Sequence, residues 1–236
     1  YGLGGSLLPG CQAQLLPVPH ATGNLAKLPD EVSDAAAVVL TDNAPTAWYG
    51  ARRARIAPGD TVVVIGLGPV GLMAVQSAFA MGAARVLGVD LLADRRKRAA
   101  DLGAEPVESD DPKQAIREML GGGADVAIEA VGADATIKLA ISAVGHRGRV
   151  SVVGVSQNRA YPFHMMAAQV KELEFHIGLC SVQYDLPALL KLTAGGRIRP
   201  EAVVTHQLPM SDGPAAYRMF ADRSDGVGKV VLDPGR

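Results

Sequence analysis

A glycine-rich hexapeptide is the part of this sequence whose residue types and spacing most directly suggest chemistry. Gly66-Leu67-Gly68-Pro69-Val70-Gly71 has the spacing G-x-G-x-x-G. Between a strand and a helix, the first glycine permits a tight turn, the second lets the backbone approach a pyrophosphate, and the third lets helix and strand pack closely. Free N–H groups and the positive end of the helix dipole then face the phosphates. A plain strand-to-helix turn would show the same pattern, so the flanking elements must decide between the two.

An acidic residue follows this turn at the distance that a dinucleotide site requires. Asp90 lies 19 residues beyond Gly71, and about 20 are expected before the carboxylate that binds the adenosine ribose hydroxyls. The same carboxylate would repel a 2'-phosphate, which favours NAD over NADP. Arg95 and Arg96 leave the alternative open, because a nearby guanidinium can hold a 2'-phosphate, although Arg95 could equally lie along the ribose of NAD. Methyltransferases and flavoproteins have similar glycine turns.

Short strands and helices alternate around these residues and predict a parallel sheet with crossover helices. The expected strands are residues 61–65, 85–89, 106–107, 126–128, 149–153 and 173–178. The expected helices are 70–81, 93–102, 112–120 and 133–144, and a short one that contains 165–170. Six strands in this order suit a doubly wound parallel sheet of the Rossmann kind, so the predicted fold class is α/β.

The segments on either side of this sheet have a different pattern. The front of the chain, up to residue 43, is rich in proline, glycine and short apolar runs, and it is expected to contain β-strands at 13–18 and 24–28. Ser33 is an N-cap candidate for a helix, and a second helix is expected to run through 48–55. Beyond the sheet the pattern predicts helix 186–193, strand 203–208, helix 211–221 and strand 229–232.

Charge and composition argue against several kinds of partner. The 236 residues carry 23 Lys and Arg against 24 Asp and Glu, a formal net charge of -1, so neither nucleic acid nor a membrane is an expected partner. The basic cluster at 95–98 is expected to be a solvated helix face. Cys11 and Cys180 are too few for a disulfide framework, so the reducing cytoplasm is the expected location. No apolar run reaches the roughly 18 residues that span a bilayer.

Six short motifs occur in one order along the chain and together resemble a known family. They are Gly10-Cys-Gln-Ala-Gln14, Pro19-His-Ala-Thr-Gly-Asn24, Leu28-Pro-Asp30, Thr41-Asp-Asn-Ala-Pro-Thr-Ala-Trp-Tyr-Gly50, Gly66 to Gly71, and Gly228-Lys-Val-Val-Leu232. The chain resembles the medium-chain, zinc-dependent alcohol dehydrogenases, including the formaldehyde, sorbitol and threonine dehydrogenase branches. The resemblance implies an NAD-binding Rossmann domain at 44–178 between two parts of a β-rich, GroES-like catalytic domain, 1–43 and 179–236.

The resemblance also implies roles for individual residues. Asp42 takes the place of the third ligand of a catalytic zinc, and a carboxylate oxygen can ligate zinc. From its position alone, Asp42 would more commonly cap the helix that follows it. Thr46 falls near the nicotinamide, and the other implied cofactor residues are Val131, Gly154, Val155 and Lys229. The valines could equally be sheet core, and Lys229, which falls where a basic residue reaches the pyrophosphate, could be a solvated charge.

The implied zinc site is incomplete in this sequence. In the family, the first zinc ligand, a Ser or Thr of the proton relay and a His-Glu pair lie in a part that would precede Tyr1. Because the sequence opens on Tyr1 without Met, we expect it to lack that part of the catalytic domain, and zinc to bind only together with the missing ligands. No histidine is paired with Cys or Glu at ligand spacing; the five are His20, His146, His164, His176 and His206.

The implied activity is hydride transfer between a small alcohol or aldehyde and NAD. In the family, zinc polarises the bound alcohol so that an alkoxide forms near neutral pH. One alternative is a zinc-free quinone or enoyl reductase of the same superfamily, usually using NADPH, against which Asp90 and Asp42 argue. The other is a non-catalytic dinucleotide-binding and dimerisation module. The resemblance implies a homodimer or homotetramer, with 173–178 pairing edge to edge. Candidate pocket residues without an assigned ligand are Trp48, Phe163, Leu179 and Cys180.

Overall fold

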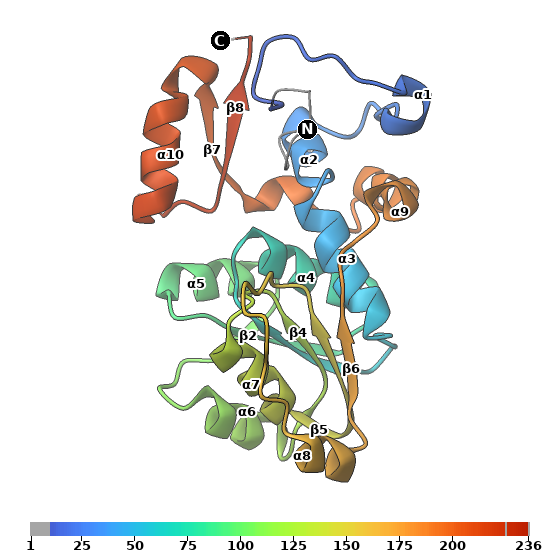
Figure 1. Cartoon of the computed structure of the whole chain (residues 1–236), viewed down its shortest axis with the longest axis vertical. Helices are drawn as coiled ribbons and strands as arrows, with labels where there is room; N and C mark the ends of the chain where they lie inside the picture. Colours follow the sequence, from blue (N-terminus) through green and yellow to red (C-terminus); the bar gives the residue numbers. More distant parts are fainter. Residues whose placement is uncertain (1–9, 225, 236) are drawn as a thin grey trace.

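Six parallel strands form the central sheet of the computed structural model, which describes residues 10–224 and 226–235. Their order is β3-β2-β1-β4-β5-β6, and Figure 1 labels β2, β4, β5 and β6 among them. The strands are β1 (Thr61–Ile65), β2 (Arg85–Val89), β3 (Glu105–Pro106), β4 (Ala124–Glu129), β5 (Val144–Val152) and β6 (Glu174–Ile177). The order reverses between β1 and β4, and in sheets of this kind ligands bind beyond the carboxyl ends of the strands at that reversal. The predicted α/β class and the doubly wound sheet are confirmed.

Both faces of the sheet are covered by helices because the central strands are apolar on both sides. In β1, Val62 and Val64 pack into one cluster and Val63 and Ile65 into the other, as the two-residue period of a strand requires. The first cluster includes side chains of α3 (Asn43–Arg53), α4 (Pro69–Ala80) and α5 (Ala93–Asp101). The second includes side chains of α6 (Pro112–Leu120) and α7 (Asp134–Ala143).

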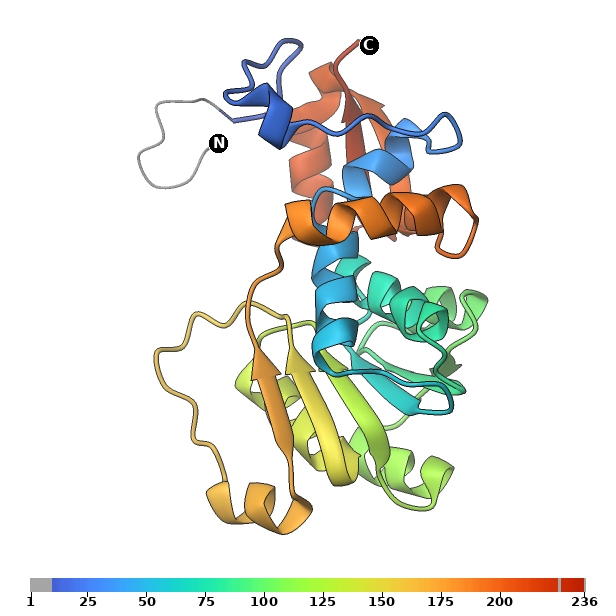
Figure 2. The same ribbon diagram turned by 90° about the vertical axis from the view of Figure 1, so that its right-hand side faces the viewer.

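A second group of elements lies at one end of the sheet. Strands β7 (Val204–Pro209) and β8 (Lys229–Asp233) pair in parallel, and α10 (Gly213–Asp222) packs beside them. In Figures 1 and 2, α3 stands between this group and the central sheet. The remaining described elements are α1 (Ala21–Asn24), α2 (Asp34–Val39), α8 (Met165–Lys171), α9 (Val182–Ala194) and the 3-10 turns Pro200–Val203 and Met210–Asp212. The domain boundaries at 43/44 and 178/179 stay a prediction.

An ion pair fastens α3 to α9. Asp185, in the first turn of α9, is buried, and its carboxylate lies 3.3 Å from Nε of Arg52 at the far end of α3. The guanidinium also lies 5.0 Å from the ring centroid of Tyr184, a cation–π distance. The helix that precedes the first strand of the sheet, α3, is therefore held to the helix that follows its last strand, α9.

The two strands predicted in the front segment are wrong. Residues 13–18 and 24–28 are not in strands, and among the described residues no strand lies beside them to complete a hydrogen-bonded ladder. Leu15 is 89% exposed and Leu25 62% exposed, so the apolar residues that suggested strands do not pack on a sheet. Instead, residues Ala21–Asn24 make a single helical turn, and the Asn24 amide donates to the carbonyl of Pro19. The N-cap role of Ser33 is confirmed, since its hydroxyl accepts from the Ala36 N–H.

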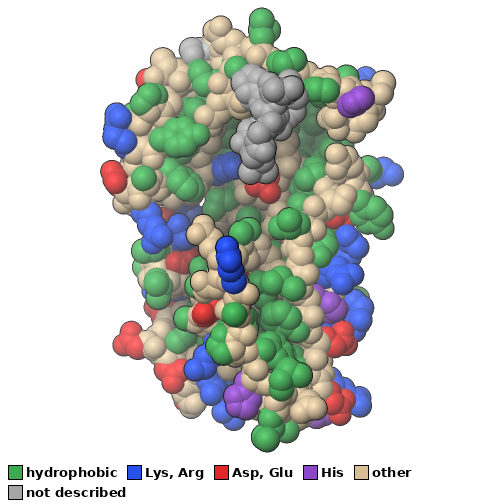
Figure 3. Space-filling model, in the orientation of Figure 1, with side chains coloured by type: hydrophobic (Ala, Val, Ile, Leu, Met, Phe, Trp, Pro, Cys, Tyr) green, Lys and Arg blue, Asp and Glu red, His purple; other side chains and the backbone are tan. Residues whose placement is uncertain are grey.

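The surface seen in Figure 3 mixes charges of both signs. Lys and Arg side chains alternate with Asp and Glu along the edges of this face, and apolar side chains lie between them. None of the helices in the described part of the chain has the length and apolar character needed to cross a membrane.

Candidate functional site

The glycine turn has the geometry that its spacing predicted. Gly66 leaves β1 with a φ of 87°, in the region that favours glycine, and its N–H donates to the carbonyl of Val89 on β2. A Cβ on Gly71 would overlap the carbonyl oxygen of Gly66, so the third glycine allows α4 to pack directly on the turn. By contrast, a Cβ on Gly68 would meet only the end of Arg95, at 3.9 Å. The second glycine therefore leaves an open approach to the start of α4, which suits a phosphate.

Asp90 connects the glycine turn to the end of β2. Its Oδ2 accepts from the Leu67 N–H at 2.8 Å, and its Oδ1 accepts from the Leu92 N–H at 2.9 Å. Nη1 of Arg95 lies 3.5 Å from Oδ2. The side chain of Asp90 is 8% exposed. Oδ2 thus accepts from both Leu67 and Arg95, whereas among the described residues Oδ1 accepts from Leu92, so Oδ1 keeps an acceptor site for a ribose hydroxyl.

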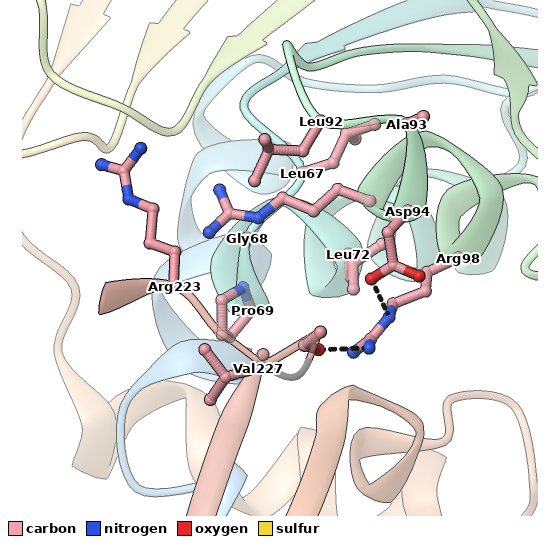
Figure 4. Close-up of a pocket in the computed structure, with 13 residues that line it drawn as sticks. Leu67, Gly68, Pro69, Leu72, Leu92, Ala93, Asp94, Arg98, Arg223 and Val227 are labelled. Carbon is pink, nitrogen blue, oxygen red and sulfur yellow. Dashed lines mark hydrogen bonds and ion pairs between the residues drawn. The ribbon is translucent and has the colours of Figure 1, made fainter. Parts of the chain in front are cut away.

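A cavity of about 270 Å³ lies on one side of this turn. Leu67, Gly68 and Pro69 line it from the turn, and three arginines line it from other segments: Arg95, Arg98 and Arg223. Figure 4 shows Arg98 and Arg223 on opposite sides of Gly68 and Pro69. Arg98 pairs with Asp94 at 3.1 Å and donates to the carbonyl of Gly226, so the loop after α10 is tied to α5. This basic cavity beside a helix N-terminus suits an anionic ligand.

A second cavity, also of about 270 Å³, lies on the other side of the same turn. Val70 lines it at the start of α4, while Val131, Gly154 and Val155 line it from the loops after β4 and β5. Asp42 and Thr46 line it from the start of α3, and Leu179 and Cys180 line it from the segment after β6. The lining is mostly apolar, with a carboxylate, a hydroxyl and a thiol as its polar side chains, an arrangement common in small-molecule sites.

The polar groups of this second cavity form a short chain of contacts. The Thr46 hydroxyl donates to Oδ1 of Asp42 at 3.3 Å and lies 3.4 Å from the Cys180 sulfur. Asp42 occupies the N-cap position of α3, yet its side chain makes no capping hydrogen bond to the helix backbone. Of the two roles that the sequence left open for Asp42, the cap is not realised, and the carboxylate faces the cavity.

The two cavities bring together most of the residues expected from the sequence, but not all of them. Four of the expected cofactor residues line neither cavity: Gly66, Gly71, Asp90 and Lys229. Leu92 and Gly228, which are close to Asp90 and Lys229 in the chain, do line the first. Phe163 packs edge to face against Phe175, and Trp48, which belongs to α3, packs against the first core cluster. Sequence reasoning missed Arg98 and Arg223 as cavity residues. Arg98 belongs to the basic cluster that was interpreted as a solvated face, and Arg223 follows a helix with no motif to mark it.

The described residues do not by themselves make up a zinc site. Zinc sites in proteins use three or four Cys, His, Asp or Glu ligands, and no group of three such side chains converges anywhere in residues 10–224 and 226–235. In the second cavity, the candidate ligands are Asp42 and Cys180. The prediction that zinc binds only with further ligands therefore stays a prediction.

Comparison with known proteins identifies the family. Residues 69–195 match the family model described as zinc-binding dehydrogenase. A probable zinc-binding alcohol dehydrogenase of Mycobacterium tuberculosis is 38% identical over 231 residues, which are 98% of this chain and 60% of that protein. An alcohol dehydrogenase of Cupriavidus necator is 33% identical over 98% of this chain and 64% of its own length. The chain thus spans about three fifths to two thirds of these relatives.

Comparison with solved structures points to the same family. The alcohol dehydrogenase from Thermus sp. ATN1 superposes with a TM-score of 0.90 at 41% identity, covering 94% of this chain and 65% of that one. Zinc-dependent alcohol dehydrogenase 2 from Streptococcus pneumonia has a TM-score of 0.85 at 35% identity, covering 92% of this chain and 64% of that one. Because the family model matches more than half of the chain and these relatives align along nearly all of it, this chain belongs to the zinc-binding dehydrogenase family.

Proposed function

We propose that this chain binds NAD and forms part of an oxidoreductase that transfers hydride between NAD and a small alcohol or aldehyde. The observation that carries the proposal is the pair of cavities on either side of the glycine turn. One is basic and suits the phosphates and the adenosine ribose, while the other is mostly apolar and suits the nicotinamide and a small substrate. The second cavity lies between the loops after β1 and β4, where the strand order reverses, and the first adjoins it across the turn, so the pair spans the usual place for a dinucleotide.

Two similar structures support a nicotinamide cofactor. One, from Escherichia coli CFT073, is described as complexed with NADH, and another, from Sinorhizobium meliloti, as bound to NADP. Their identities are 23% and 21%, so their likeness concerns the fold and does not choose between the two cofactors. We base the preference for NAD on Asp90, whose carboxylate lies at the end of β2 and would repel a 2'-phosphate.

The cavity beside Thr46 suggests how this chain assists the reaction. Bound NAD supplies the hydride acceptor. The Thr46 hydroxyl donates to Asp42 and can accept a hydrogen bond from an alcohol. A proton that leaves the alcohol can therefore pass to the Thr46 oxygen while the Thr46 proton passes to the Asp42 carboxylate. The valines at 131 and 155 make part of the surrounding wall apolar.

We also propose that the protein is a cytoplasmic homodimer that pairs through β6. This strand is an edge of the six-stranded sheet, and Ile177 on it is 65% exposed. An edge strand presents unpaired backbone groups that a second copy can complete with twofold symmetry. Light scattering of the wild-type chain and of Ile177→Lys tests this proposal: the wild type should have twice the chain mass, and the variant should shift toward the monomer.

Fluorescence titration with NADH and NADPH tests the cofactor proposal. The chain should bind NADH in the micromolar range, which corresponds to about 8 kcal/mol, and NADPH at least about tenfold more weakly, a difference of about 1.4 kcal/mol. Equal affinity for the two cofactors would remove the preference for NAD. An absence of binding at millimolar cofactor would overturn the proposed function.

A further inference from the structure

A buried carboxylate lies beneath the wall of the second cavity. Glu129 ends β4 and is fully buried. Its Oε1 accepts from the N–H groups of Val131 and Gly132, both at 2.8 Å. The Thr136 hydroxyl also lies 2.8 Å from Oε1, and it shares its one proton between this atom and the Ala133 carbonyl oxygen at the same distance. Two consecutive backbone N–H groups of the loop after β4 are therefore aimed at one oxygen atom, and α7 is attached to the same atom through Thr136.

This loop has little else to hold its outer side in place. Val131 is 48% exposed and lines the cavity, so its side chain is not fixed by burial. On its inner side the loop touches both neighbouring loops. A Cβ on Gly66 would overlap the side chain of Val131, and a Cβ on Gly132 would overlap the backbone of Val155. The position of the loop therefore sets the position of Val131 against the glycine turn and against the loop after β5.

The second oxygen of Glu129 makes a carboxylate costly at this position, so the carboxylate must supply something that an apolar side chain would not. Oε2 is buried and has no hydrogen-bond partner among the described residues. Burying an unpaired polar atom costs free energy, about 1–3 kcal/mol in proteins. A Leu or Met would fill the space at the end of β4 without that cost. What those residues would not supply is an acceptor for the two N–H groups of the loop.

We propose that Glu129 is a positioning residue for the nicotinamide half of the cofactor: by accepting the N–H groups of Val131 and Gly132, it holds the loop that forms one wall of the second cavity. The inference rests on the proposed function, because it assigns the second cavity to the nicotinamide. The inference goes beyond the proposed function by naming a residue that touches neither the cofactor nor the substrate and that acts on only one half of the site.

The two halves of the site can be separated with two ligands. NADH needs both cavities, whereas ADP-ribose has no nicotinamide ring and so needs the part beside Arg95 and Arg98 but places no ring in the second cavity. In Glu129→Gln, the side chain keeps its size, but a neutral amide is a weaker acceptor and its NH₂ group would be buried without a partner. NADH should bind at least about tenfold more weakly to Glu129→Gln than to the wild type, which is about 1.4 kcal/mol. ADP-ribose should bind with unchanged affinity.

A second variant keeps the test valid if Glu129→Gln folds poorly. Thr136→Val removes one of the three donors from a half-buried position and leaves the carboxylate in place. It should weaken NADH binding to a smaller degree than Glu129→Gln and should not affect ADP-ribose. The matched control is Ser151→Ala on the neighbouring strand β5. It removes a buried hydroxyl that has no hydrogen-bond partner in the part of the chain that the structure describes, and it should alter neither affinity.

The outcomes distinguish this inference from the proposed function. An equal loss of NADH and ADP-ribose affinity in the Glu129 variant would show a general effect on the fold and overturn the positioning role. Unchanged NADH affinity in both the Glu129 and the Thr136 variant would overturn it as well. If the wild-type chain bound ADP-ribose but not NADH, the assignment of the second cavity to the nicotinamide would be wrong. Binding of neither ligand would overturn the proposed function itself.

Discussion

The backbone N–H of Leu67 donates a 2.8 Å hydrogen bond to Oδ2 of Asp90, so the carboxylate proposed to bind ribose also holds the glycine turn in place. One residue thus links two parts of the proposed cofactor site, the glycine turn and the end of β2. Replacing Asp90 should affect both parts at once.

Asp90→Ala should weaken NADH binding by at least about tenfold, because hydrogen bonds to a charged group contribute about 1.5–3 kcal/mol each. The loss for NADPH should be smaller, since the repulsion of the 2'-phosphate disappears together with the carboxylate. Fluorescence titration with the two cofactors measures both constants. Asp101→Ala, which removes an exposed acid from the end of α5, is the control. Equal losses for NADH and NADPH would contradict a role of Asp90 in choosing between them.

Gly71→Ala should destabilise the protein, because the new Cβ would overlap the carbonyl of Gly66 and push α4 away from the turn. Overpacking of this kind typically costs about 1–3 kcal/mol, and urea unfolding measures it. The control is Gly122→Ala, where a Cβ would have nothing within 4 Å. A Gly71 variant as stable as the Gly122 variant would show that the turn can relax without cost.

The two cysteines offer an internal comparison for the second cavity. Both are free thiols: Cys180 lines the cavity and is half-buried, whereas Cys11 is exposed and lies outside both cavities. NADH at ten times its dissociation constant should slow alkylation of Cys180 by iodoacetamide roughly tenfold, since only the free protein reacts. Alkylation of Cys11 should not change. Peptide mass spectrometry measures both rates in the same sample, and equal rates at Cys180 with and without NADH would place the nicotinamide elsewhere.

Arg52→Ala should lower the free energy of unfolding, because it leaves the buried carboxylate of Asp185 without its partner. Removing one member of a fully buried pair costs about 3–5 kcal/mol. Since the Arg52 side chain is 40% exposed, water screens the pair, and we expect about 2 kcal/mol.

Arg53→Ala, on the exposed side of the same helix, is the matched control and should change stability by less than about 0.5 kcal/mol. Denaturation of Arg52→Ala, Asp185→Ala and the double variant gives the coupling between the two residues. Strictly additive losses would mean that the ion pair contributes nothing.

Lowering the pH should remove the stabilisation that the Arg85–Glu105 ion pair gives to the edge of the sheet. Arg85 donates to both carboxylate oxygens of Glu105, at 2.8 and 2.7 Å, and this hydrogen bonding lowers the pKa of Glu105 despite the opposing effect of burial. A carboxyl whose pKa is lower in the folded state stabilises the protein above its unfolded pKa, about 4.3. That contribution is lost as the pH falls through the lower, folded value.

The difference in unfolding free energy between the wild type and Glu105→Gln should therefore be constant above about pH 5 and shrink below about pH 4. It should stay under about 1 kcal/mol and decrease in 1 M NaCl, because both side chains are 41% exposed. Urea titrations at pH 7, 4 and 3 measure it. A difference that grows on acidification would contradict the direction of the pKa change.

The sequence was sufficient to predict those elements whose formation depends on residues close together in the chain. The run Thr61–Ile65, the glycine turn and the apolar start of α4 carry their own periodicity and turn chemistry, so the sheet and the place of Asp90 after its second strand could be predicted. The strands expected at 13–18 and 24–28 failed because a strand depends on a partner, and local composition does not show whether one is present.

Contacts between distant segments were harder to predict. Arg223 and Arg98 line the same cavity only because the chain returns to α5 after α10. Glu129 did carry a signal, since it is a charged residue that directly follows three apolar residues, 126–128, at the end of a strand. That signal indicates that the residue is unusual, but the identity of its three donors requires the fold.

The close packing of Gly132 against Gly154 and Val155 has a consequence for the evolution of this site. A Cβ on Gly154 would overlap the backbone N of Gly132, so the two loops touch main chain to main chain beneath the second cavity. A floor built from backbone does not vary with side-chain type or rotamer. Differences in the molecules accepted must then come from the few side chains on the walls, such as Thr46, Leu179 and Cys180. Substitutions there can change selectivity while the seat of the cofactor keeps its shape.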